Sequence, residues 1–95
     1  MNGMTRITAH VDGQVQGVGF RWWVRGQSVD LNLDGSAENL PDGRVRIVAE
    51  GTRDSVQALL ERLEAQPSAH RRPGQVTSVT WVWEDPLGEQ GFLVR

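Results

Sequence analysis

The spacing of the apolar residues changes on either side of a glycine-rich run at residues 13–21. Before the run, apolar side chains alternate with polar ones, which predicts a half-buried strand over 5–11. After the run, apolar side chains recur every three or four residues, which predicts a helix over 20–31. The chain must therefore turn from a strand into a helix within a few residues, and glycines allow such a turn.

The same patterns extend over the rest of the chain. They predict four further strands and a second helix with Thr52 as its N-cap: strands over 33–40, 44–50, 75–84 and 92–95, and a helix after residue 52. The order is βαββαβ with a short final strand. It indicates an α+β fold of the ferredoxin-like type, with two helices on one face of an antiparallel-type sheet. With 95 residues, the chain has the length of one domain, residues 1–95.

Composition limits the kinds of site that this chain can hold. The sequence contains no cysteine, which excludes disulfides, thiolate nucleophiles and zinc–thiolate centres. Its net charge of −2 does not favour nucleic acid as a partner, although all ten basic residues are arginines, which suit bidentate phosphate contacts. We see no signal peptide and no run of about eighteen apolar residues, and we expect a cytoplasmic protein with no membrane partner.

The glycine-rich run has the features of an anion site. Gly13, Gly17 and Gly19 let successive backbone amides face one concavity, and the run leads into the positive end of a helix. Arg21 lies in the first helical turn, where the helix dipole does not stabilise a cation, so a bound oxyanion would supply its partner. The run matches neither a Walker loop nor a dinucleotide fingerprint, and an ordinary glycine-rich turn is the alternative.

Two blocks of sequence resemble a known family. The string V-D-G-Q-V-Q-G-V-G-F-R at 11–21 and the string N-L-P-D-G-R-V at 39–45 closely resemble the signatures of the acylphosphatase family, at the family's spacing. The end of the chain, 91–95, resembles the family as well, so the likeness covers essentially the whole sequence. The resemblance implies a hydrolase of the carboxyl–phosphate anhydride of acyl phosphates that uses no metal or cofactor. It also implies that Arg21 and Asn39 are the catalytic residues.

The implied mechanism assigns a role to each part of the site. We expect the substrate phosphate to be held by backbone amides and by the Arg21 guanidinium, the binding residues being Gln16, Gly17, Val18, Gly19, Phe20 and Arg21. Asn39 would orient the attacking water, and no strong base is needed because the carboxylate leaves easily. Inorganic phosphate should then act as product and competitive inhibitor, and a monomer is expected.

Some residues depart from the family pattern or leave alternatives open. Ser36, Ala37 and Glu38 stand where the family often has other residues, and strand alternation should direct the Glu38 side chain away from the anion. His10 could serve as a base, but we favour an ordinary strand histidine, and we expect a solvated basic loop at 70–72. Two alternatives stay open. The chain could be a non-catalytic anion-binding or regulatory module on the same fold, or a relative of the acylphosphatase-like domain of hydrogenase-maturation carbamoyltransferases.

Overall fold

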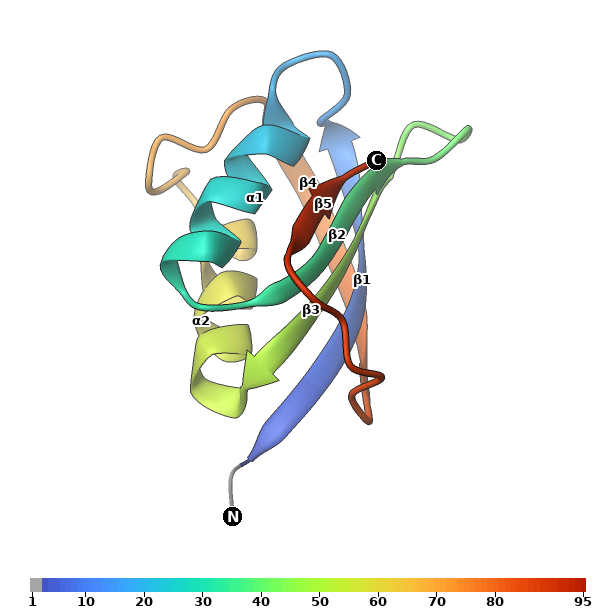
Figure 1. The fold of residues 1–95 in the computed structure, drawn as a ribbon. Helices are drawn as coiled ribbons and strands as arrows, with labels where there is room; N and C mark the ends of the chain where they lie inside the picture. Colours follow the sequence, from blue (N-terminus) through green and yellow to red (C-terminus); the bar gives the residue numbers. More distant parts are fainter. Residues whose placement is uncertain (1–2) are drawn as a thin grey trace.

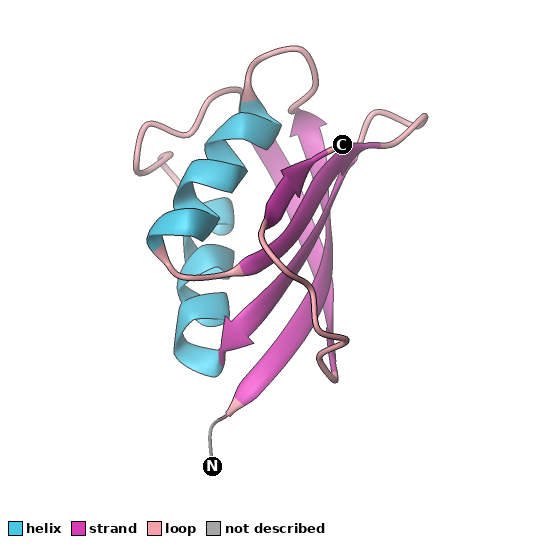
Figure 2. Ribbon diagram, in the orientation of Figure 1, coloured by secondary structure: helices cyan, strands magenta, loops and turns pink. Residues whose placement is uncertain are grey.

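The computed structural model describes residues 3–95, and its elements follow the predicted order (Figure 1). The elements are strands β1 (Met4–Gln14), β2 (Asp34–Asn39), β3 (Val45–Thr52), β4 (Gln75–Glu84) and β5 (Phe92–Val94), and helices α1 (Phe20–Asp30) and α2 (Arg53–Glu64). Both helices lie on one face of the sheet and leave the other face open (Figure 2). Within residues 3–95, no helix is long and apolar enough to cross a membrane.

The five strands form one sheet in the order β4-β1-β3-β2-β5. The pairs β1–β3, β1–β4 and β2–β3 are antiparallel, as predicted, whereas β5 runs parallel to β2. The sheet is therefore mixed, which refines the predicted antiparallel-type sheet. The parallel pair arises because the segment after β4 crosses to the far side of the sheet before β5 begins (Figure 1).

The core lies between the sheet and the two helices. The alternating residues of β1 that were predicted to face inward, Ile7, Ala9 and Val11, have no exposed surface. Helix α2 contributes the predicted stripe at i, i+3, i+4 and i+7, which consists of Val56, Leu59, Leu60 and Leu63. Burying each large aliphatic side chain contributes about 1.5–3 kcal/mol, so these two faces hold the layers together.

The ends of the helices confirm one prediction and correct another. The Thr52 hydroxyl accepts a hydrogen bond from the Ser55 amide at 3.2 Å and caps α2, and Asn32 follows α1 with a left-handed φ of 59°. The predicted solvated loop at 70–72 is wrong for Arg72, which is only 5% exposed. Its Nη1 donates to the carbonyls of Arg62 and Leu63, which the last turn of α2 leaves without helical partners.

A buried carboxylate holds the segment that leads into β5. Both oxygens of Glu50, at the end of the core-forming part of β3, accept hydrogen bonds from the backbone amides of residues 87–89, at 2.7, 3.1 and 2.9 Å. Arg6 Nη1 donates to the same carboxylate at 2.7 Å, and the side chains of Arg6 and Glu50 are only 12% and 5% exposed. Burial by itself raises the pKa of Glu50, but the amide donors and Arg6 outweigh it and hold the pKa below its usual range.

We expect Glu50→Gln to lower the free energy of unfolding by about 2–3 kcal/mol near pH 7, because Arg6 loses its most buried partner. The ionised carboxylate stabilises the fold above the unfolded-chain pKa of about 4.3, and this contribution is lost as the pH falls through the lower folded pKa. The difference between the two proteins should therefore shrink toward pH 3 or so, as measured by urea unfolding. Glu64→Gln, which removes an exposed carboxylate from α2, is the matched control. If Glu50→Gln lowered the free energy of unfolding as much near pH 3 as near pH 7, this account would be contradicted.

Candidate active site

The site is built on the five-residue connection between β1 and α1, residues 15–19. Val15 and Phe20 anchor its two ends in the core, each only 1% exposed. Between them Gly17 and Gly19 adopt left-handed backbone, with φ of 76° and 86°, which suits glycine because other residues are strained there. Gly19 is the N-cap of α1, and no side chain within residues 3–95 caps that helix. The first amides of α1 are therefore free to receive an anion.

Gly13 has a different role from the other two glycines. It lies within β1 at a bulge, where the pairing with β4 shifts register. A Cβ atom at this position would lie 2.0 Å from the carbonyl oxygen of Gln75, so no larger residue fits without moving a strand. Gly13 thus allows β1 and β4 to approach each other beneath the loop, and the anion concavity begins after it.

Arg21 reaches from α1 to Arg95, the residue directly after β5. Its Nη1 donates a hydrogen bond to the main-chain oxygen of Arg95, and the Arg95 amide donates to the Ala37 carbonyl at 2.9 Å. This chain of bonds ties the guanidinium to β2 two residues before Asn39. Arg21 was expected to find its partner only in a bound anion, but one of its five N–H groups already has a partner in the protein.

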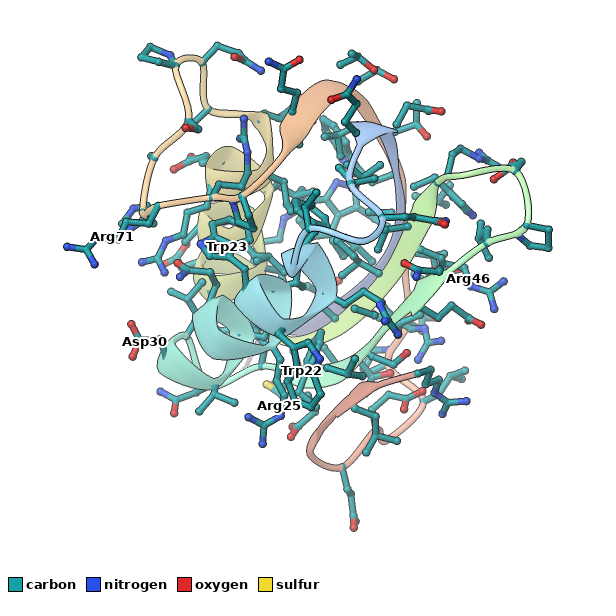
Figure 3. The ribbon with its side chains drawn as sticks, turned by 90° about the horizontal axis from the view of Figure 1, so that it is seen from above. Trp22, Trp23, Arg25, Asp30, Arg46 and Arg71 are labelled. Carbon is teal, nitrogen blue, oxygen red and sulfur yellow. The ribbon has the colours of Figure 1, made fainter. Side chains whose placement is uncertain are left out.

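Asn39 is the last residue of β2 and is exposed. Among residues 3–95 its side-chain amide has no hydrogen-bond partner, so it is available to a ligand or a water. The preceding residue points the other way, as expected: the Glu38 carboxylate accepts from Arg46 Nε at 3.1 Å. Arg46 lies on the face of the sheet away from α1 (Figure 3), so Glu38 adds no negative charge to the loop side.

A side chain of the loop binds the turn that follows Asn39. Gln16 Nε2 donates to the carbonyl oxygens of Leu40 and Arg44, at 2.8 and 2.9 Å. The loop, the turn between β2 and β3, and the end of β5 thus meet at one end of the molecule (Figure 1). The sequence analysis predicted a backbone contact at Gln16 and missed this side-chain link, because the link joins residues that lie far apart in the sequence.

The other groups that could bind a ligand or act as a base lie away from the loop at 15–19. His10 alternates with the buried residues Ala9 and Val11, so it faces the open side of the sheet and not the loop. That open side has a hollow of about 340 Å³ whose lining includes Arg6, Glu38 and Arg46. Within residues 3–95, no three His, Cys, Asp or Glu side chains gather in a way that could hold a metal ion.

The two tryptophans of α1 flank the site differently. Trp23 stacks on Phe20 with ring centroids 5.8 Å apart, and its Nε1 donates to the His70 carbonyl at 2.7 Å. Trp22 is 62% exposed and lies on the side of the helix that carries Arg25 (Figure 3). Trp23 therefore fixes the first turn of α1 against the loop at 67–73, while Trp22 forms part of the rim.

Comparison with known proteins supplies the family. The family model described as Acylphosphatase matches residues 7–94. The chain belongs to the acylphosphatase family. An acylphosphatase of Corynebacterium efficiens is 57% identical over 90 residues, which cover 95% of this chain and 91% of that protein.

Solved acylphosphatases share the fold. The structure of an acylphosphatase from Coxiella burnetii is 36% identical with a TM-score of 0.86, covering 98% of this chain and 94% of that one. The acylphosphatase from Bacillus subtilis is 30% identical with a TM-score of 0.85, covering 96% and 98%. Family, relatives and fold together show that the chain is an enzyme with acylphosphatase activity, and they favour it over the non-catalytic module.

Proposed function

We propose that the site at 16–21 holds the phosphate of an acyl phosphate while Asn39 directs water onto it. The observation that carries the proposal is the uncapped start of α1, where left-handed Gly17 and Gly19 leave the first helical amides without a side-chain partner. A phosphate oxyanion fits these donors and the positive end of the helix dipole. The binding residues are Gln16, Gly17, Val18, Gly19, Phe20 and Arg21.

Arg21 contributes charge to the transition state. Phosphoryl transfer needs stabilisation of the three equatorial oxygens, and fixed amides together with a guanidinium provide it without reorganisation. The bond from Arg21 to Arg95 fixes one nitrogen of the guanidinium and leaves the remaining N–H groups for the phosphate. The Arg95 main chain thus acts as a support for the arginine.

Asn39 positions the nucleophile. Its exposed carboxamide can accept a hydrogen bond from a water and donate one to the phosphate or to the same water. An oriented water suffices, because the carboxylate of the acyl group leaves readily and the transition state is loose. The monomeric state and the cytoplasmic location expected from the sequence stay predictions.

Hydrolysis of benzoyl phosphate in the presence of inorganic phosphate tests this placement. We expect turnover with phosphate as a competitive inhibitor, raising the apparent KM and leaving kcat unchanged, because product and substrate share the loop. In a parallel titration followed by NMR, the amides of Gly17 to Arg21 should show the largest shifts. Non-competitive inhibition, or shifts confined to the hollow on the open face of the sheet, would count against the loop as the site.

A further inference from the structure

The side chain of Gln16 joins the two halves of the proposed site. Gln16 belongs to the loop at 15–19, while its two acceptors, the carbonyls of Leu40 and Arg44, belong to the turn directly after Asn39. The side chain is partly buried, and both N–H groups of one amide nitrogen are used, at 2.8 and 2.9 Å. A single group therefore fixes the loop to the turn at two points.

The turn does not need Gln16 in order to form. The Leu40 amide donates to the Arg44 carbonyl at 2.8 Å and the Gly43 amide donates to the Leu40 carbonyl at 3.1 Å. Asp42 adds two bonds within the turn, accepting from the Arg44 amide at 3.1 Å and from Arg44 Nε at 2.8 Å. Both carbonyls that Gln16 binds are thus already paired by the turn's own backbone, so loss of the side chain leaves a closed turn.

The loop does not need the Gln16 side chain either. Its ends are held by the buried side chains of Val15 and Phe20, and its shape by the left-handed glycines. What the Gln16 bonds add is the placement of one preformed piece against the other. A second connection, the chain of bonds from Arg21 through Arg95 to Ala37, joins α1 to β2 independently of Gln16.

We propose that Gln16 is a positioning residue, which sets the distance and direction from the phosphate loop to the water-orienting amide of Asn39. The proposal rests on the proposed roles of the loop and Asn39. It follows from general catalytic principles, because an in-line nucleophile works only within a narrow range of positions, and a misplacement of about 1 Å can cost roughly a hundredfold in rate.

Gln16→Ala tests the proposal by separating chemistry from phosphate binding. We expect kcat for benzoyl phosphate to fall roughly tenfold to a hundredfold. The inhibition constant of inorganic phosphate should change by less than about twofold, because the amide donors and Arg21 remain. Gln14→Ala is the matched control: Gln14 is an exposed glutamine two residues earlier, with no side-chain bond among residues 3–95, and its loss should leave kcat unchanged.

Gln16→Glu gives a second, pH-dependent readout. A carboxylate of the same size faces two carbonyl oxygens and cannot donate to either, so kcat near pH 7 should be at least as low as in Gln16→Ala. A protonated carboxyl can donate to one of them. The ratio of its kcat to that of the wild type should rise as the pH is lowered from about 7 to about 5, toward the ordinary glutamate pKa of about 4.3.

A double-mutant cycle with Asn39→Ala decides between positioning and general damage. If Gln16 acts through Asn39, the two substitutions together should lower kcat no further than Asn39→Ala alone. Multiplicative losses, or a wild-type kcat in Gln16→Ala, would overturn the proposal, as would a loss of kcat matched by an equal loss of phosphate binding. If Gln16→Ala unfolds in a thermal melt, Gln16→Glu and its pH profile carry the test.

Failure of the proposed function looks different. In that case Asn39→Ala by itself keeps wild-type kcat, or phosphate does not compete with benzoyl phosphate in the wild type. When Asn39→Ala is impaired and phosphate competes, a normal kcat in Gln16→Ala refutes the positioning role alone. The single variants and the wild type therefore separate the two conclusions.

Discussion

Replacing Arg21 with alanine is expected to lower kcat for benzoyl phosphate by at least about a thousandfold. Loss of one preorganised neutral donor already costs roughly 3–4 kcal/mol, or about 10²–10³ in rate, and this substitution also removes a full positive charge. Phosphate should inhibit the variant much more weakly than the wild type, because Arg21 is the only one of the proposed binding residues 16–21 that has a charged side chain. Steady-state kinetics with and without phosphate measures both effects.

Two further variants separate charge from structure at Arg21. Arg21→Lys keeps the charge without the bidentate fork, so its kcat should lie between those of wild type and Arg21→Ala. Arg25→Ala is the matched control, because Arg25 also lies on α1 and donates to a main-chain oxygen in β5, that of Phe92 at 3.2 Å, just as Arg21 donates to the main chain directly after β5. If Arg25→Ala lost as much activity as Arg21→Ala, the damage would come from weaker packing of β5 and not from a missing catalytic cation.

Asn39→Ala is expected to reduce kcat by about 10²–10³ through a different route. The loop and Arg21 remain, so inhibition by phosphate should be nearly unchanged, and the exposed position predicts an unaltered melting temperature. Low kcat with intact phosphate binding is the signature of a group that acts on the nucleophile. The pair of variants therefore assigns phosphate binding and water orientation to different residues.

Asn39→Asp sharpens that assignment. The side chain keeps its size but gains a negative charge beside the bound phosphate, so binding of phosphate should weaken along with turnover. Equal phosphate inhibition in Asn39→Asp and Asn39→Ala would indicate that residue 39 lies too far from the anion to act on it. Wild-type turnover in Asn39→Ala would contradict the proposed role of Asn39 in orienting water.

The order of the elements could be predicted because its signals are local. Alternation over 5–11, the change of period at 20 and the cap at Thr52 each depend on neighbouring residues, and the structure confirms them. The orientation of β5 could not be predicted in the same way. Three residues carry too little pattern to say which strand they join, and the partner is more than fifty residues away in the sequence.

The hydrogen bonds that support the candidate site could not be predicted either, because they join residues far apart in the sequence. The bonds from Gln16 to the turn after Asn39 and from Glu50 to residues 87–89 connect segments that only the folded chain brings together. Arg72 was expected in solvent because its neighbours are polar. Its side chain is buried instead, because it donates hydrogen bonds to carbonyls that the end of α2 leaves unpaired. Sequence could indicate Arg21 and Asn39 as candidates because both lie in recognisable motifs, whereas the residues that support them are connected through long-range contacts.

The short strand β5 also decides what surrounds β2. Without it, β2 would be the outer strand of the sheet and would present its backbone groups to other molecules, as exposed edges do in aggregation. Three paired residues, held by the Glu50 carboxylate through the preceding segment, cover that edge. The strand that ends in Asn39 is thereby shielded from pairing with a second chain, so the same few contacts that hold β5 also cover the edge of the strand that carries the proposed water-orienting residue.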